Sequence, residues 1–199
     1  GKNKTLFDSP ADWISPNPEG GYAEDPPAAD GRKVIINDTD HLWGIGGNQP
    51  WVWKSFCRGM NPIFMDPFTS TPAEGKDGQN INWTDFLTTT FPLDPAWDPI
   101  RRSMGYAKCY ADRMNLAAMT PCGDLASSGY CLASPGHEYL AYFPEGGAAT
   151  LDLSNLAVEA KLEWFNPNTG QTENAVAQGG KKVELRSPFD CDTVLYAKS

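Results

Sequence analysis

The sequence lacks the features that would mark a membrane protein or a nucleic-acid-binding protein. No apolar run approaches the ~20 residues that a helix needs to cross a bilayer. Lys and Arg number 16 against 25 Asp and Glu, and the net charge of −9 argues against nucleic acid or an anionic membrane surface as partner. No secretory apolar segment lies near Gly1, but a signal could have been removed, so a secreted or periplasmic location stays open.

The cysteines lack the spacing of a metal or redox site. No pair has the Cys-x-x-Cys spacing, so we expect neither a zinc centre nor a redox dithiol. Cys122 and Cys131 are close enough in sequence to close a small loop, and Cys191 is an alternative partner for either. Free buried thiols are an equally good interpretation, so the redox compartment stays open.

Two apolar runs in the first half of the chain are each followed by carboxylates. Val34–Ile36 precedes Asp38 and Asp40, and Pro62–Met65 precedes Asp66. A continuous apolar run is typical of a parallel strand that is buried on both faces. Ligands of βα-repeat proteins bind at the carboxyl ends of such strands. The segment therefore predicts a βαβ unit with a functional site at its rim.

The flanking segments predict loops and two helices. Residues 1–32 are rich in Pro, Gly, Asp and Asn without periodicity, which predicts an extended surface loop. Pro50–Gly59 suits a short helix with proline near its start and glycine near its end. Trp97–Met119 is the clearest helix, because apolar residues recur on one face at spacings of four and three. Ser70–Phe91 is again loop-like.

After Thr120 the pattern changes to short apolar or alternating runs with turn signals between them. The turns are PEGG at Pro144, NPNTG at Asn166 and QGG at Gln178. The runs are Gly129–Ala133, Glu138–Phe143, Ala149–Leu153, Val158–Phe165, Lys181–Leu185 and Thr193–Ala197. This pattern predicts an antiparallel β-sandwich or small barrel. We therefore expect an α/β segment over residues 1–120 and an all-β domain over residues 121–199.

Long motifs in this chain resemble a family of carbohydrate-active enzymes. NDTDHLWGIGG, WVWKSFCRGMNPIFMDPF and RRSMGYAKCYADRMNLAAMTPCGDLASSGYCLA are similar to the C-terminal part of the apiosidase-like glycoside hydrolases, which are (β/α)8-barrel proteins. The tail, with EYLAYFPEGGAATLDLS, EWFNPNTGQ and SPFDCDTVLYA, resembles the module known as the collagen-binding domain of a collagenase, which commonly follows such barrels. The resemblance covers nearly the whole chain from about Leu6.

This resemblance implies an incomplete barrel. Val34–His41 resembles barrel strand seven with its catalytic-face end, Asn61–Pro67 resembles strand eight, and Trp97–Met119 the helix after it. Strands one to six have no counterpart in this sequence, and related barrel hydrolases usually carry the general acid at the end of strand four. The resemblance thus implies the C-terminal portion of a TIM-type (β/α)8 barrel followed by an antiparallel β-sandwich, and a chain that is inactive alone.

Glycoside hydrolysis needs two carboxyl groups flanking the scissile bond, about 5–5.5 Å apart for retention or about 6.5–9.5 Å for inversion. One of them stays protonated through a raised pKa. On an extended strand end, Asp38 and Asp40 share one face, while Thr39 and His41 share the other. We predict Asp38 and Asp40 as the candidates for the catalytic carboxylate of this strand, with the other one of the two binding a sugar hydroxyl. The alternative is that either one accepts backbone N–H bonds in the turn.

Four further residues are predicted to bind substrate. His41 is placed to hydrogen-bond a sugar hydroxyl, and Trp43 and Trp51 have flat faces for sugar C–H groups. Asp66 either contacts the same ligand or pairs with Arg58 or another nearby base. The Asp-x-Asp-His cluster suits a hard cation only weakly, because the acidic spacing of an EF-hand loop is absent. We therefore predict no metal and no cofactor.

These observations favour a carbohydrate-active protein, a fragment of a glycoside hydrolase that acts on polysaccharide or oligosaccharide. One alternative is a non-catalytic module that binds a glycan or a matrix protein. Another is an accessory domain that stabilises a hydrolase barrel. The expected partners are a carbohydrate substrate and either further copies of the chain or the missing part of the barrel, which would cover exposed sheet edges.

Overall fold

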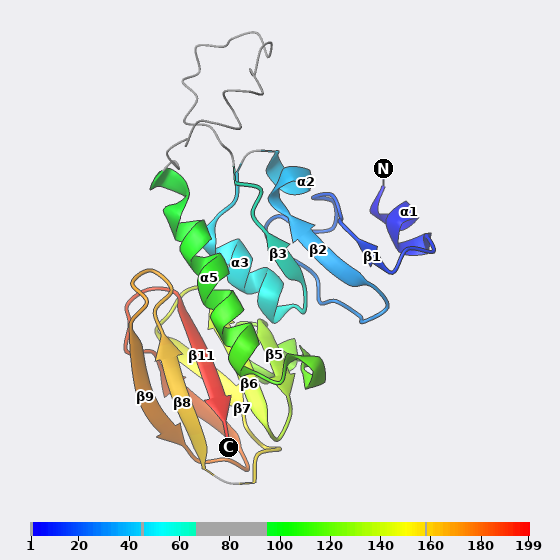
Figure 1. Ribbon diagram of the computed structural model, residues 1–199. Coiled ribbons are helices and arrows are strands. Elements are labelled where there is room, and N and C mark those ends of the chain that lie inside the picture. Colours follow the sequence, from blue (N-terminus) through cyan, green and yellow to red (C-terminus); the bar gives the residue numbers. More distant parts are fainter. Residues whose placement is uncertain (1, 45, 67–94, 158) are drawn as a thin grey trace.

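The computed structural model describes residues 2–44, 46–66, 95–157 and 159–199, and Figure 1 shows a small parallel sheet and helices beside a larger antiparallel sheet. The predicted loop Ser70–Phe91 lies outside the described residues. Within them, strands predominate over helices. No helix in the described part of the chain is both long enough and apolar enough to span a bilayer.

The parallel sheet confirms the two predicted strands and adds a third. Its members are β1 (Trp13–Ile14), β2 (Val34–Asp38) and β3 (Asn61–Ile63), in the order β1-β2-β3. Both neighbouring pairs are parallel. All three strands therefore end at the same edge of the sheet, which positions the residues that follow them.

The prediction of a loop over residues 1–32 is wrong in part. That segment contains helix α1 (Asn3–Asp8) and the two-residue strand β1. The buried Asn3 side chain anchors the segment, because its amide donates to the carbonyl oxygens of Asn17 and Glu19, at 3.1 and 2.7 Å. Ile14 and Tyr22 are also buried in the core, but the buried residues of this segment are irregularly spaced, so the sequence shows no hydrophobic period there.

Both predicted helices are present between the sheets, the second one ends early, and the helix at Thr39–Trp43 was not predicted. The helices are α2 (Thr39–Trp43), α3 (Gln49–Cys57), the 3-10 helix η1 (Pro95–Trp97), α5 (Asp98–Arg113) and the 3-10 helix η2 (Leu116–Ala118). Asn48 caps α3 by accepting from the backbone N–H of Trp51 at 2.9 Å. Helix α5 ends before the predicted Met119, because Met114 adopts an extended conformation.

The antiparallel part contains every strand that the turn signals predict within the described residues. Its six-stranded sheet has the order β4-β5-β6-β11-β8-β9, and β10 pairs with β7 in a separate two-stranded sheet. The bounds are β4 (Thr120–Pro121), β5 (Cys131–Ser134), β6 (Glu138–Phe143), β7 (Ala148–Asp152), β8 (Ala160–Phe165), β9 (Thr172–Ala177), β10 (Lys182–Arg186) and β11 (Thr193–Lys198). Strand β9 was not predicted, because all but its last residue are exposed and it lacks an apolar alternation.

The central strands of the six-stranded sheet, such as β6, are buried on both faces. On strand β6, Tyr139 and Ala141 belong to a core shared with Leu151 of β7, whereas Leu140 and Tyr142 belong to a core shared with α3 and α5. This second core also contains Trp51 and Trp53 of α3, together with Ile100 and Tyr110 of α5. The helices of the α/β segment and one face of the antiparallel sheet therefore bury their apolar side chains together. Figure 1 shows α5 running along this sheet.

Candidate functional site

Asp38 ends strand β2 and at once caps a short helix. Its backbone is extended, and its Oδ1 accepts from the backbone N–H of His41 at 2.9 Å, so α2 begins at Thr39. Aspartate is among the residues preferred at this capping position. The expectation of an extended strand end is therefore wrong, and Asp38 meets His41 instead of lying on the opposite face. Figure 1 shows α2 at the tip of β2.

Three polar side chains meet at this edge of the parallel sheet. The Nδ1 atom of His41 lies 2.9 Å from Oδ2 of Asp38 and 3.1 Å from Oγ of Ser15. The Ser15 hydroxyl also donates to Oδ2 of Asp38. Ser15 follows β1 directly, so it reaches the site from the carboxyl end of the neighbouring strand.

Sequence reasoning missed Ser15 because its strand is only two residues long. The sequence feature that could have indicated it is the pair Trp13-Ile14 followed by a serine. This is a shorter form of the pattern of β2, in which apolar residues are followed by polar ones. The arrangement is not a Ser-His-Asp relay. In such a relay the serine and the aspartate contact opposite nitrogens of the imidazole, whereas here both contact Nδ1.

The surroundings of Asp38 hold it in the ionised form. Burial raises the pKa of its carboxyl, but the hydrogen bonds from Ser15 and from the backbone and ring of His41 lower it, and the net pKa is below the ordinary value. A general acid in glycoside hydrolysis needs a raised pKa. Asp38 is therefore unsuited to that role and fits an ionised carboxylate that positions His41.

Asp40 and His41 provide the open side of the site. Asp40 is exposed, the His41 side chain is 49% exposed and that of Asp38 only 11%. One ligating atom from each of the three residues lies within 4.8 Å of the others, so the set offers three ligands of the kinds that divalent cations take. Asp38 is the N-cap of α2 and Asp40 lies in its first turn, so both carboxyls come from one turn of one helix, whereas the two carboxyls of a glycosidase flank the scissile bond. They cannot flank a scissile bond without a third group.

The predicted aromatic residues lie behind this cluster. Trp51 is 1% exposed, and its Nε1 donates to the carbonyl of Tyr22 at 3.2 Å, so its ring has no open face for a sugar. Trp43 is half-buried and meets Trp51 edge-on, with ring centroids 5.5 Å apart. The structure therefore places Trp51 as support for Trp43 and leaves Trp43 as the aromatic side chain nearer the surface.

Asp66 follows β3 at the same edge of the sheet but is held in an ion pair. Its two oxygens accept from Nε and Nη2 of Arg101 at 2.6 and 2.7 Å, and Arg101 also contacts Asp98 at 2.8 Å. The predicted alternative of a basic partner is thus confirmed, with Arg101 of α5 in place of Arg58. This bidentate pair ties the end of β3 to the start of α5.

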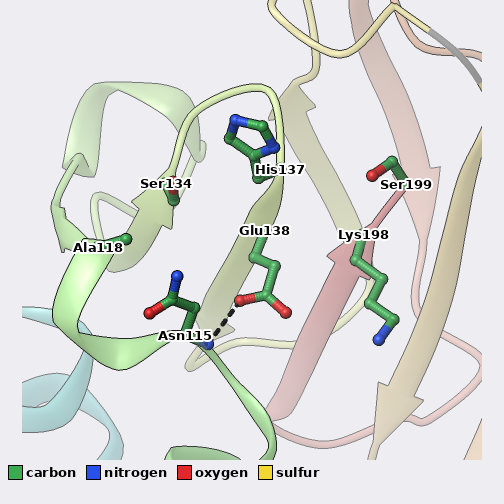
Figure 2. Close-up of a pocket in the computed structure, with 7 residues that line it drawn as sticks. All are labelled: Asn115, Ala118, Ser134, His137, Glu138, Lys198 and Ser199. Carbon is green, nitrogen blue, oxygen red and sulfur yellow. Dashed lines mark hydrogen bonds between the residues drawn. The ribbon is translucent and has the colours of Figure 1, made fainter.

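A polar pocket lies elsewhere, where η2, the β5–β6 turn and the end of β11 meet. Its volume is about 490 Å³. Figure 2 shows Asn115, His137, Glu138 and Lys198 on its walls. The Glu138 carboxylate accepts from the backbone N–H of Asn115 and from the hydroxyl of Tyr196, both at 2.8 Å. No predicted site residue and no aromatic ring lines this pocket, and its one carboxylate serves the structure.

Comparisons with known proteins agree with this architecture at a coarse level. Residues 124–193 match a family model described as "Putative collagen-binding domain of a collagenase". A search of curated proteins gave no match. One similar solved structure, named "Glycoside hydrolase", has 14% sequence identity and a TM-score of 0.60, and the match covers 96% of this chain and 49% of the other.

A second similar structure is a family 5 glycoside hydrolase from Bacteroides vulgatus. It has 16% identity and a TM-score of 0.59, and the match covers 87% of this chain and 43% of that one. This chain thus spans about half the length of the solved structures it matches. At such low identity the likeness concerns the fold alone: the chain is similar in fold to glycoside hydrolases.

Proposed function

We propose that this chain is part of a glycoside hydrolase and that Asp38, Asp40 and His41 line its sugar site. The observation that carries the proposal is the meeting of Asp38, His41 and Ser15 at the carboxyl edge of a parallel sheet, with Asp40 exposed beside them. This edge is where βα proteins bind their ligands. The likeness in fold to glycoside hydrolases supports a carbohydrate as the ligand.

The finer architecture follows from the same proposal. Residues 1–120 form the C-terminal portion of a TIM-type (β/α)8 barrel of the apiosidase-like kind, with β1, β2 and β3 as its last three strands. Residues 121–199 form a β-sandwich. The structure has three such strands where the sequence predicted two. The additional strand, β1, contributes to the site because Ser15 follows it directly.

Each side chain has a distinct role in this proposal. Asp40 presents the accessible carboxylate, and His41 offers its half-exposed ring to a sugar hydroxyl. Asp38 acts as the positioning residue for His41, since both of its oxygens are already engaged. Trp43 provides an apolar edge, with Trp51 buried behind it. The general acid comes from outside this chain, so the chain alone binds sugar without hydrolysing it.

Calorimetric titration of the chain with a panel of neutral oligosaccharides tests this site. We expect Asp40→Asn and His41→Ala each to weaken binding by about tenfold, since each removes a hydrogen-bonding group worth about 1.4 kcal/mol. Asp112→Asn is the matched control, because Asp112 is an exposed carboxylate on α5 that pairs with Lys108 away from the site. Undiminished binding by both site variants would refute the assignment.

A specific observation also favours an accessory role for the antiparallel sheet. Glu163 on β8 accepts from Arg113 and from the Tyr110 hydroxyl of α5, both at 2.8 Å, above the shared aromatic core. A module that moved freely to bind a matrix protein would not bury one face against its neighbour in this way. We propose that the antiparallel sheet stabilises the barrel segment. If the sheet also binds a matrix protein, it must do so through the surfaces that face away from the helices.

A further inference from the structure

Two cysteines lie opposite each other at the start of the antiparallel sheet. The pairing of β4 with β5 places Pro121 opposite Leu132. The next residue along, Cys122, therefore lies opposite Cys131. The backbone N–H of Cys122 donates to the carbonyl oxygen of Cys131 at 2.8 Å, which agrees with this alignment. Both are free thiols in the structure.

The two side chains also lie on the same face of the sheet. Cys131 is fully buried in the core shared with Leu151 of β7, and the partly buried Cys122 packs against the same core. Residues directly opposite in a hydrogen-bonded antiparallel pair have Cα atoms about 5.5 Å apart. A disulfide spans Cα separations of about 4.4–6.8 Å, so the strands already hold this pair at a distance that a bridge requires.

The other three cysteines, all in the described part of the chain, lie elsewhere. Cys57 belongs to the core on the opposite face of the six-stranded sheet. Cys109 is exposed on α5. Cys191 precedes β11, and its carbonyl oxygen lies against Gly146, beyond the end of β6. The two facing residues are therefore the favoured pair among the alternatives that the sequence left open.

We propose that Cys122 and Cys131 form an intramolecular disulfide by exchange with a small-molecule disulfide such as oxidised glutathione. The Cys122 thiolate attacks one sulfur of the small disulfide, so that a mixed disulfide forms and one small thiolate leaves. The Cys131 thiolate then attacks the sulfur of Cys122, which forms the protein disulfide and releases the second small thiolate. The two protein thiols lose two electrons to the small disulfide, and their two protons pass to the two small thiols.

Burial decides which of the two thiols reacts first. It raises the pKa of the Cys131 thiol well above its ordinary value, which suppresses the reactive thiolate, and it keeps reagents away from the sulfur. Cys122 is only partly buried, so it is the point of entry for the small disulfide. The exchange should therefore pass through a mixed disulfide at Cys122, and the second step should be the slower one.

The bridge would close a loop at the junction between α5 and the sheet. The loop begins with the 3-10 helix η3 (Gly123–Leu125). Gly123 lies so close to Gly129 that a Cβ there would be 2.5 Å from the Gly129 carbonyl oxygen, and the Arg58 guanidinium after α3 lies beside both glycines. The loop is thus already closely packed without the bridge. A disulfide would stabilise it mainly by restricting the unfolded chain.

Peptide mapping of the reduced chain after exchange with oxidised glutathione tests this proposal. A protease that cleaves before Asp124 separates the two cysteines, whereas trypsin has no site between them. Under non-reducing conditions we expect the peptides that carry Cys122 and Cys131 to remain joined and to separate after reduction with dithiothreitol. The bridged chain should melt about 5–10 °C higher than the reduced chain.

Two serine variants make the test specific. Cys122→Ser should abolish both the cross-link and the rise in melting temperature. Cys191→Ser is the matched control, because Cys191 is also a partly buried cysteine, and this variant should keep both. A cross-link through Cys57 or Cys191, no cross-link after exchange, or a bridged chain with an unchanged melting temperature would overturn the proposal.

Discussion

Replacing Trp53 by alanine tests whether the two parts of the chain fold as one unit. Trp53 is fully buried on α3. Its ring stacks on Tyr142 of β6 at 6.5 Å and lies 5.9 Å from Phe165 of β8 and 6.0 Å from Tyr110 of α5. A buried Trp→Ala change costs about 3–5 kcal/mol, and each lost aromatic contact adds about 0.5–1.5 kcal/mol beyond burial. We therefore expect a loss of about 5 kcal/mol in the free energy of unfolding.

A loss of this size is comparable with the whole stability of many domains, about 5–15 kcal/mol. Urea unfolding followed by tryptophan fluorescence and by far-UV circular dichroism measures it, and both signals should move together in a single transition. Trp13→Ala is the control, because Trp13 is 59% exposed and should change stability in the isolated chain by about 0.5 kcal/mol. A loss below about 1 kcal/mol for Trp53→Ala, or two transitions of which only one moves, would refute the shared core.

Two further predictions concern ionised groups. Ser15→Ala should raise the pKa of Asp38, because it removes a hydrogen bond that favours the carboxylate. An NMR titration that follows the carboxyl carbon of Asp38 measures this pKa. An unchanged or lower pKa would contradict the hydrogen bond from Ser15 to Asp38. Burial raises the pKa of Glu163, but hydrogen bonds from Arg113 and Tyr110 bring it below its ordinary value of 4.5. The ionised Glu163 therefore stabilises the folded state above pH 4.5, and this stabilisation is lost as the pH falls through the pKa of Glu163 in the folded state. Glu163→Gln should lower the free energy of unfolding by about 1 kcal/mol at pH 7 and should make it less dependent on pH in the acid range, as measured by urea unfolding at several pH values. An unaltered pH dependence would show that the Glu163–Arg113 ion pair does not stabilise the fold.

The sequence predicted the parts of the fold that depend on hydrophobic patterns. The apolar runs of β2 and β6 and the helical spacing of α5 were recognised because each buries a periodic set of side chains. Strands β1 and β9 were missed for opposite reasons. The first has two residues, and the second is almost wholly exposed, so neither carries a period that a pattern could detect.

The candidate site was predicted in composition but not in geometry. Asp38, Asp40 and His41 lie together, as their closeness in sequence suggested. The capping of α2 by Asp38 could not be foreseen, because a strand end and a helix start compete for the same aspartate and the choice depends on its neighbours. Ser15 lies 23 residues before Asp38, just after β1, and the parallel pairing of β1 with β2 brings it to the site.

The most direct test of the sugar site is NMR mapping of an oligosaccharide titration on the isotope-labelled chain. The account predicts saturable shift changes concentrated at Asp40, His41, Trp43 and Ser15, at the carboxyl edge of the parallel sheet. Saturable changes confined to the antiparallel sheet or to the pocket around His137 would contradict it and would make the C-terminal strands the carbohydrate-binding surface.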